Sequence, residues 1–394
     1  MCRIMRTLIG AMLLLCAVNV NAQMDKQTIQ WQGENREYYL FEPSSRQLGD
    51  SLAVLVFLHG FDGGIDSYCN SIDFQQAANQ MGWIILLPQA LEARVEFMGT
   101  SLSIGNAWNS GIALSLMGNT IVPNSNVDDA GFLLALVDSV DAAYSIRSDS
   151  IFFAGFSMGA FMTYRMAIQH ADRIAGAAAA SGLIPICWAD SVPARPLPIL
   201  HIHGTDDQMI ASNGTATPIP GMGQMTLGLS VDSTLSYWRH FDQCDATATI
   251  TTYDNSVDDG LLFTLYTYGG GLENTQVAFL SVDGGGHQWY EEGHDVQYLT
   301  VIHDFFTGHN SYQHSGISNP YPNQRLICYP NPVSQSLVVD SPCSDKLYIY
   351  NAAGICVDIL SLTEGNNTIN TSTYPAGRYM LRTSLGMAAQ IVVK

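Results

Sequence analysis

The chain has 394 residues, which is long for one ordinary domain and fits one large domain joined to a small one. Hydrophobic residues make up 47% of it and charged residues only 13%, so a large core can be buried and a disordered chain is disfavoured. The formal net charge of −19 argues against nucleic acid as a partner, because binding to phosphates needs a basic surface.

The first 22 residues have the pattern of a signal peptide. Arg3 and Arg6 precede an apolar run over residues 8–18, and the small residue Ala22 stands before polar sequence. The run is too short for a convincing membrane span, and no other stretch is long and apolar enough to be one. We therefore expect an exported protein that has no transmembrane segment.

After the signal peptide, buried strands alternate with helices. The turn signal at residues 33–35 separates two strand-like runs and predicts an opening β-hairpin. Continuous apolar runs predict buried strands at residues 54–58, 84–87, 151–154, 199–202 and 277–282, and helical spacing predicts helices over residues 133–144, 158–170 and 230–241. This alternation predicts an α/β three-layer sandwich, in which helices cover both faces of a mostly parallel sheet. Asp128 and Asp129 are expected to cap the first of these helices.

The composition changes after residue 306. Residues 309–325 are polar and rich in Gly, Pro, Ser and Asn, which predicts a linker. Short strands are then predicted at residues 336–339, 347–350, 377–382 and 390–393, and they indicate a small all-β sandwich over residues 326–394.

The cysteines do not suggest a metal site. Cys2 and Cys16 leave with the signal peptide, which leaves six of the eight cysteines in the mature chain. None has CxxC or Cys/His metal spacing, so we expect isolated apolar thiols, with one bridge in each part as the alternative, and no metal.

The strongest motif is G-F-S-M-G over residues 155–159, between the strand at 151–154 and the helix at 158–170. A serine at such a sharp strand-to-helix turn projects its hydroxyl from the edge of the sheet. We therefore predict that Ser157 is a nucleophile. The N–H of Met158, at the positive end of the helix, is predicted to stabilise a developing oxyanion.

A serine hydroxyl needs a base that is oriented by an acid, and in this arrangement the chain order is Ser, then Asp or Glu, then His. Asp206 and Asp207 follow the fourth predicted buried strand, where the acid is expected. His287 follows the last one in a glycine-rich loop, which lets it turn toward the serine. His294 and His303 compete with it, but we expect them to be surface or packing residues.

The loop after the first buried strand is expected to provide the second oxyanion donor. We favour the N–H of Phe61, with Gly60 as the alternative, and we expect His59 to bond the backbone of this loop. Trp108 and Trp289 are candidate substrate-binding aromatics at the rim of the site, and ordinary core packing is an equal alternative for both.

Between residues 36 and 289 the chain resembles the secreted esterases grouped with polyhydroxybutyrate depolymerases and feruloyl or acetylxylan esterases. The matching segments, in order, are LHG at 58–60, WN at 108–109, VDD at 127–129 with GF at 131–132, the serine motif, HGTDD at 203–207 and GGHQW at 285–289. The resemblance implies the α/β-hydrolase fold and serine esterase chemistry without a metal or an organic cofactor. It also implies that Asp207 is the acid and His287 the base.

The tail resembles the C-terminal sorting domain of the type IX secretion system of Bacteroidetes. The matching segments are YPNP at 329–332, LYIYN at 347–351 with Gly354, GRY at 377–379 and the final strand. This resemblance implies that residues 326–394 engage the secretion machinery. The protein would then pass through the periplasm and be released or attached to the cell surface.

Together these patterns predict a signal peptide (1–22), a catalytic domain (23–308), a linker (309–325) and a sorting domain (326–394). The expected function is a secreted serine carboxylic ester hydrolase that forms an acyl-enzyme. Its substrate would be a polyester such as poly(3-hydroxybutyrate), or a feruloylated or acetylated plant polysaccharide. A serine peptidase on the same fold and a catalytically silent surface binding protein are the alternatives.

Overall fold

The computed structural model describes residues 26–97, 100–116, 119–216, 225–308, 326–351, 356–383 and 388–394. The predicted signal peptide and linker lie outside the described residues. Within them, the chain up to residue 308 contains one large sheet and three small hairpins, and the chain from residue 326 contains two further sheets.

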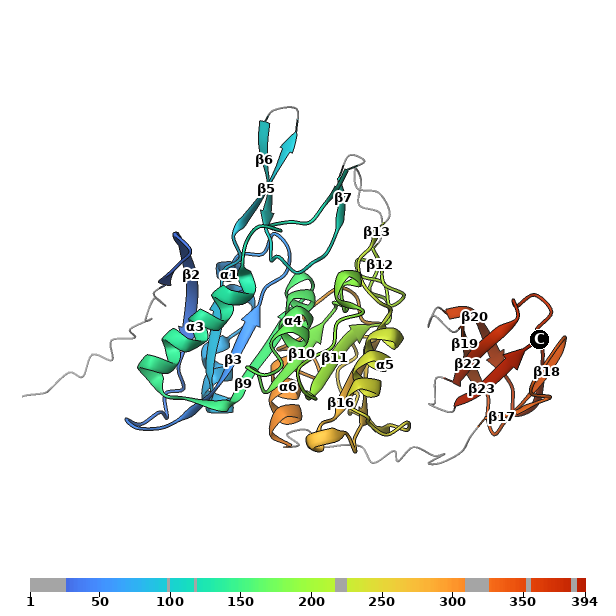
Figure 1. The fold of residues 1–394 in the computed structure, drawn as a ribbon. Coiled ribbons are helices and arrows are strands. Elements are labelled where there is room, and N and C mark those ends of the chain that lie inside the picture. The colour runs from blue at the N-terminus through green and yellow to red at the C-terminus, as the bar shows by residue number, and fades with distance from the viewer. Residues whose placement is uncertain are drawn as a thin grey trace, which may run out of the picture.

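A ten-stranded sheet forms the centre of the larger part (Figure 1). Its middle strands, from β4 to β16, run parallel, and antiparallel strands extend both edges. In spatial order the strands are β1 (Gln27–Trp31), β2 (Glu34–Phe41), β4 (Ile84–Pro88), β3 (Leu52–Leu58), β9 (Ile146–Phe156), β10 (Gly176–Ala180), β11 (Ile199–Gly204), β16 (Val277–Asp283), β15 (Leu262–Tyr268) and β14 (Thr249–Thr252).

Both faces of the sheet are buried. Along β3, Val54 and Val56 belong to one hydrophobic core, whereas Leu55 and Phe57 belong to another on the opposite face. This is why the strand reads as an uninterrupted apolar run. Side chains of α3, α4 and α5 join the first core, and those of α1, α2 and α6 join the second. The predicted three-layer sandwich is thereby confirmed; its helices are α1 (Ile65–Ser71), α2 (Phe74–Met81), α3 (Asp129–Tyr144), α4 (Met158–Gln169), α5 (Val231–Phe241) and α6 (Tyr298–Thr307).

Several strands were not predicted from the sequence. β10 consists of a glycine and four alanines, a composition without a strand signal, yet it lies fully buried between β9 and β11. Three short hairpins also lie outside the main sheet: β5 (Glu92–Phe97) with β6 (Thr100–Asn106), β7 (Leu114–Leu116) with β8 (Asn119–Ile121), and β12 (Thr215–Ala216) with β13 (Met225–Thr226). All three project from the same end of the sheet (Figure 1).

Asp128 and Asp129, at the N-terminus of α3, have different roles. Asp128 is the N-cap, and its carboxylate accepts a hydrogen bond from Gly131 N at 2.9 Å, as predicted. Asp129 instead turns inward, where its Oδ1 accepts from Arg36 Nη2 at 2.7 Å and its Oδ2 accepts from Asn109 N at 2.7 Å. The Arg36 and Asp129 side chains are 1% and 0% exposed, so this ion pair ties β2 to α3 inside the protein.

We expect Asp129→Ala to destabilise the protein by about 3–5 kcal/mol, because it leaves the Arg36 guanidinium buried and without its counter-charge. The adjacent Asp128→Ala is the matched control, and it should cost only about 1 kcal/mol because it removes a helix cap. Urea unfolding monitored by circular dichroism measures both changes. Equal losses in the two variants would contradict the assignment of the buried ion pair.

The C-terminal part is a small β-sandwich, as predicted. One sheet has the order β17-β18-β21 and the other β20-β19-β22-β23. Their inward side chains share one core, to which Leu337, Ile349, Leu381 and Ile391 belong, each 0% exposed. The strands are β17 (Ile327–Tyr329), β18 (Ser336–Ser341), β19 (Asp345–Asn351), β20 (Cys356–Leu362), β21 (Gly365–Asn370), β22 (Gly377–Thr383) and β23 (Ala388–Val393).

Five cysteine side chains are described in the structure, and each has a free thiol. They are Cys69, Cys187, Cys244, Cys328 and Cys343. These five fit the expectation of isolated thiols.

Candidate active site

Ser157 occupies the turn between β9 and α4. Its backbone has φ 55° and ψ −121°, a left-handed conformation that is strained for a residue with a side chain. The serine N–H donates to Ala180 O at 2.9 Å, which fixes the turn against the end of β10. The strain is therefore held by the surrounding structure, and it places the hydroxyl at the carboxyl edge of the parallel strands.

The two glycines of the serine motif are required by close approach. A Cβ on Gly155 would collide with the carbonyl of Gly159, and a Cβ on Gly159 would collide with the carbonyl of Leu58. Helix α4 can therefore start directly against β3 only because both positions lack a side chain. Close packing around Ser157 thus explains both glycines of the motif at 155–159.

The structure brings His287 to Ser157 across 130 positions of sequence. His287 lies in the loop after β16, and its Nε2 is 3.0 Å from Ser157 Oγ. Its other ring nitrogen, Nδ1, lies 2.8 Å from Asp207 Oδ2. His294 pairs with Asp259, at 2.7 Å, and so does not take part in this cluster.

Asp207 is held as a carboxylate. Its Oδ1 accepts hydrogen bonds from Met209 N at 3.0 Å and Ile210 N at 2.8 Å, and its side chain is fully buried. Burial alone would raise the pKa of Asp207, but the hydrogen bond and the charge of His287 and the backbone N–H of Ile210 outweigh it, so its pKa is lowered. An ionised carboxylate can only accept, so Nδ1 of His287 carries the proton and Nε2 is free to accept from Ser157.

The neighbouring carboxylate does not reach the histidine. Asp206 is exposed, and its backbone N–H donates to Gly285 O at 2.9 Å, which joins the loop after β11 to the loop that carries His287. The residue pattern left both Asp206 and Asp207 open and the family resemblance implied Asp207; the geometry agrees with Asp207.

The loop after β3 lies against Ser157. A Cβ on Gly60 would be 3.3 Å from Ser157 Cβ, which shows how closely this loop approaches. The N–H of Gly60 is already engaged, because it donates to Tyr68 Oη at 3.0 Å. Phe61 is therefore the better candidate for the second oxyanion donor, beside Met158, whose N–H as the first of α4 has no intrahelical acceptor.

His59 and Trp108 hold the loop after β3 through contacts with its backbone. His59 is fully buried; its Nδ1 lies 2.7 Å from Gly60 O and its Nε2 accepts from Ala90 N at 3.0 Å. Burial lowers the pKa of His59 to about 4, so the ring is neutral. The prediction of Trp108 as a rim aromatic is wrong. Its side chain is 0% exposed and its indole N–H donates to His59 O at 2.9 Å, which makes it a core residue.

Trp289 lies close to His287, the candidate base. It is half-buried, its indole N–H donates to Glu291 Oε1 at 2.7 Å, and its ring meets Phe57 edge-on. It also lies edge-on to Phe156, whose ring is 4.8 Å from that of His287. A contact between Trp289 and substrate stays a prediction.

Two further residues, Tyr68 and Gln89, shape the site and were not predicted from the sequence. Tyr68 fixes the oxyanion loop from α1, and Gln89 accepts from Ile65 N at 2.9 Å while its amide nitrogen lies 3.0 Å from His59 Nε2. Gln89 directly follows β4, at the carboxyl end of a buried strand. Because ligand sites form at this edge of such sheets, its position could have marked Gln89 as a candidate site residue. Nothing in the local sequence singles out Tyr68.

Comparisons with known proteins place both parts of the chain. Residues 49–217 match the family described as phospholipase/carboxylesterase, and residues 327–394 match the family described as a secretion system C-terminal sorting domain. Both matches confirm the predicted relationships, and the second confirms that the protein is secreted or displayed at the cell surface. Among the described residues, no helix is both long and apolar enough to cross a membrane.

Individual relatives are esterases. A bifunctional acetylxylan esterase/xylanase of Neocallimastix patriciarum is 25% identical over 257 residues, which are 65% of this chain and 31% of that protein. Feruloyl esterase B of Piromyces equi is 26% identical over 199 residues, 50% of this chain and 34% of the relative. The chain thus spans about a third of the length of these relatives. The solved acetyl xylan esterase from Aspergillus awamori aligns with 72% of this chain and 99% of its own, with 16% identity and a TM-score of 0.45.

Proposed function

We propose that this chain, an α/β-hydrolase related to acetylxylan and feruloyl esterases and equipped with a sorting domain, is a secreted serine carboxylic ester hydrolase. One observation carries the proposal. Ser157 Oγ, the His287 ring and the Asp207 carboxylate form a chain of hydrogen bonds of 3.0 and 2.8 Å at the carboxyl edge of the sheet.

The reaction would proceed through an acyl-enzyme. His287 Nε2 takes the proton of Ser157 as Oγ attacks the ester carbonyl, and Asp207 stabilises the imidazolium that forms. The N–H groups of Met158 and Phe61 stabilise the oxyanion of the tetrahedral intermediate. His287 then donates the proton to the departing alkoxide. A water that gives its proton to His287 next attacks the acyl group. His287 then returns this proton to Ser157 Oγ as the carboxylic acid is released.

The surface around the nucleophile favours an apolar acyl group. Two large apolar side chains are exposed on loops that adjoin the candidate catalytic residues: Phe61 (36%) and Met209 (50%). Phe61 follows the glycine that touches Ser157, and the N–H of Met209 binds Asp207. Such side chains suit an aromatic ring better than a charged group.

We therefore favour an aryl or short acyl ester on a plant polysaccharide, such as a feruloyl or acetyl ester, in line with the names of the relatives. A polyester of the poly(3-hydroxybutyrate) type is the second candidate, because the same apolar loops would accept its chain. A peptidase is disfavoured. Its activity would call for a site that recognises a peptide terminus, and the sequence offers no segment for one.

The domain organisation belongs to the same proposal. Residues 1–22 would direct the chain to the periplasm, residues 23–308 would carry the esterase, and residues 309–325 would link it to the sorting domain at 326–394. That domain would engage the type IX secretion machinery.

Hydrolysis of a panel of esters by the mature chain tests the function. We expect turnover of p-nitrophenyl acetate, p-nitrophenyl butyrate and methyl ferulate. Of the two p-nitrophenyl esters, which share a leaving group, the butyrate should have the higher kcat/KM because the exposed apolar loops add binding energy in the transition state. Suspended poly(3-hydroxybutyrate) and acetylated xylan separate the two polymer candidates. Folded protein without turnover on any of these would refute the esterase assignment.

A further inference from the structure

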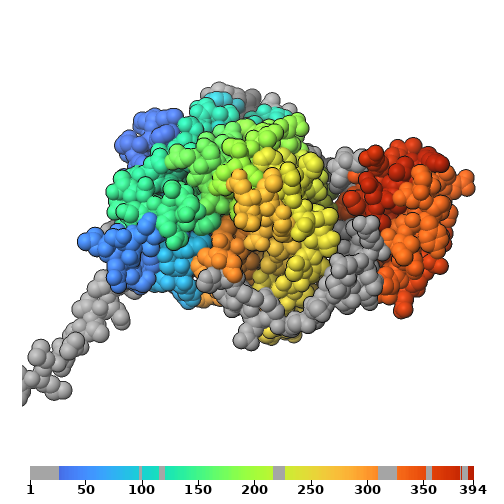
Figure 2. All heavy atoms as spheres, turned by 60° about the horizontal axis from the view of Figure 1, so that its bottom comes forward, coloured from blue at the N-terminus to red at the C-terminus, as the bar shows by residue number. Residues whose placement is uncertain are grey.

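A large hollow lies on the layer of the protein formed by α2 and α6. Its volume is about 1310 Å³, and neither Ser157 nor His287 is among its lining residues. In Figure 2 the orange surface of the α6 region lies beside light-blue surface from the first quarter of the chain. The hollow exceeds the roughly 300–1,000 Å³ of a typical small-molecule site, so it has room for an extended ligand.

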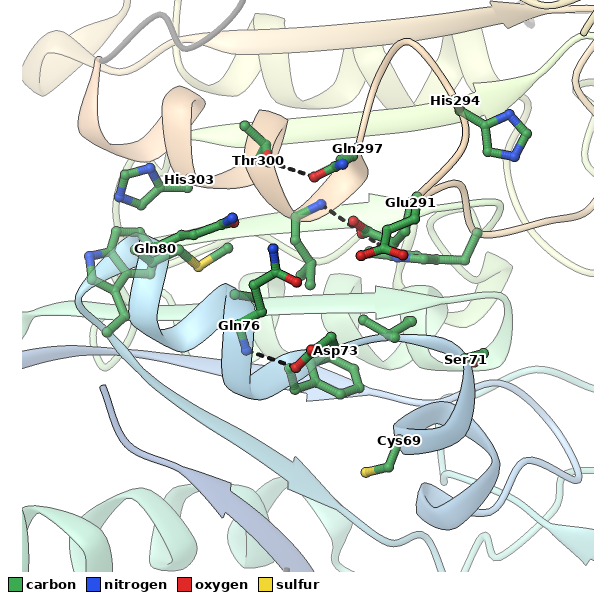
Figure 3. A pocket seen from close by; sticks show the side chains of 18 of the residues that line it. Cys69, Ser71, Asp73, Gln76, Gln80, Glu291, His294, Gln297, Thr300 and His303 are labelled. Carbon is green, nitrogen blue, oxygen red and sulfur yellow. Dashed lines mark hydrogen bonds between the residues drawn. The ribbon is translucent and has the colours of Figure 1, made fainter. Parts of the chain in front are cut away.

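The walls present amides and hydroxyls at helical spacing. Gln76 and Gln80 are exposed and lie one turn apart on α2, and Thr300 lies on α6. Figure 3 shows the two glutamines on one side of the hollow, with Thr300 and His303 on the other. These groups offer hydrogen-bond donors and acceptors together, as a ligand rich in hydroxyl groups requires.

The charges of the lining exclude an anionic ligand. Among the described residues around the hollow there is no lysine or arginine, whereas Asp73 and Glu292 contribute carboxylates. A third carboxyl, that of Glu291, also lines the hollow, and burial raises its pKa to about 7. Two hydrogen bonds fix the Glu291 side chain: its Oε1 accepts one from Trp289 Nε1 at 2.7 Å and one from Leu299 N at 3.0 Å. The hollow therefore suits a neutral ligand and opposes phosphate or a uronic acid.

We propose that this hollow binds a neutral oligosaccharide, namely the unesterified sugar backbone of the polysaccharide whose esters the active site cleaves. The choice of sugar rests on the proposed function, whereas the binding of a neutral polyol rests on the lining alone. Trp289 adds an aromatic wall that can stack on a sugar ring. Its ring also meets Phe156, which contacts the His287 ring, so the bound chain would lie against the support of the catalytic base.

Isothermal titration of the mature Ser157→Ala protein with xylohexaose tests the proposal, because this probe has no ester and needs no catalysis. We expect saturable binding, and no heat with inorganic phosphate. A Gln76→Ala/Gln80→Ala variant should bind about tenfold more weakly, since two hydrogen bonds of ordinary net strength are lost. Alanine favours the helix, so α2 should remain folded. Thr300→Val weakens binding from the opposite wall.

Gln75→Ala is the matched control. Gln75 also lies on α2, but its amide donates to Glu42 O at 2.8 Å and it does not line the hollow. This variant should bind xylohexaose as the parent protein does. Absence of xylohexaose binding, or binding that the hollow variants leave unchanged, would overturn the proposal. When the same variants are made with Ser157 intact, they should hydrolyse p-nitrophenyl acetate as fast as the wild-type protein. If the wild-type protein did not hydrolyse this ester, the esterase function would be refuted instead.

Discussion

Replacement of Ser157 by alanine is expected to reduce kcat for p-nitrophenyl butyrate by about 10⁴–10⁶-fold, because no other group can form the acyl-enzyme. The loss should appear in kcat and not in KM, since the side chain that is removed reacts with the substrate and does little to bind it. Stopped-flow and steady-state assays on the mature chain measure both parameters. Relief of the left-handed backbone by glycine at this position would change stability, so alanine is the better probe.

Ser150→Ala is the matched control for this experiment. Ser150 lies in the same strand, β9, and its hydroxyl donates to the adjacent Asp149 at 2.9 Å. Its removal should leave kcat within about twofold, as expected for a surface substitution far from special features. Comparable losses in the two variants would mean that the strand, and not the nucleophile, accounts for the effect.

Replacement of Asp207 by asparagine is expected to lower kcat by about 10³–10⁴-fold. The amide keeps the shape of the side chain but can present N–H to His287 Nδ1. Nδ1 would then be the acceptor, and Nε2 would carry the proton that it must instead take from Ser157. The backbone N–H groups of Met209 and Ile210 donate to this side chain. Their hydrogen bonds to a neutral amide would be weaker than those to a carboxylate.

The adjacent Asp206→Asn separates the catalytic carboxylate from a general effect of charge. Both substitutions remove one negative charge from the same loop, but Asp206 is exposed and only its backbone N–H is used, in the bond to Gly285. We expect Asp206→Asn to retain nearly full kcat. If Asp206→Asn were the damaging variant, the assignment of the acid would have to be exchanged.

Much of the fold could be predicted from the sequence because buried parallel strands leave a direct signature. Runs such as residues 54–58 and 277–282 are apolar at every position, and the structure places them in the sheet with both faces covered. β10 was not predicted because alanine has no preference for strands. It is a strand because it pairs with β9 on one side and β11 on the other, and its small side chains let α4 pack against it.

The sequence by itself was enough to predict the candidate site. A serine between a buried strand and a helix, acids after a later strand and a histidine after the last one follow from local pattern and chain order. The residue pattern left two adjacent acids open and the family resemblance implied Asp207, which the structure places against His287. Only the tertiary structure showed that Trp108 is a core residue beneath the loop after β3 and that the Gly60 N–H is already bonded to Tyr68. These outcomes depend on contacts between segments that are far apart in the chain. Local sequence does not indicate which side chain will contact a distant backbone group.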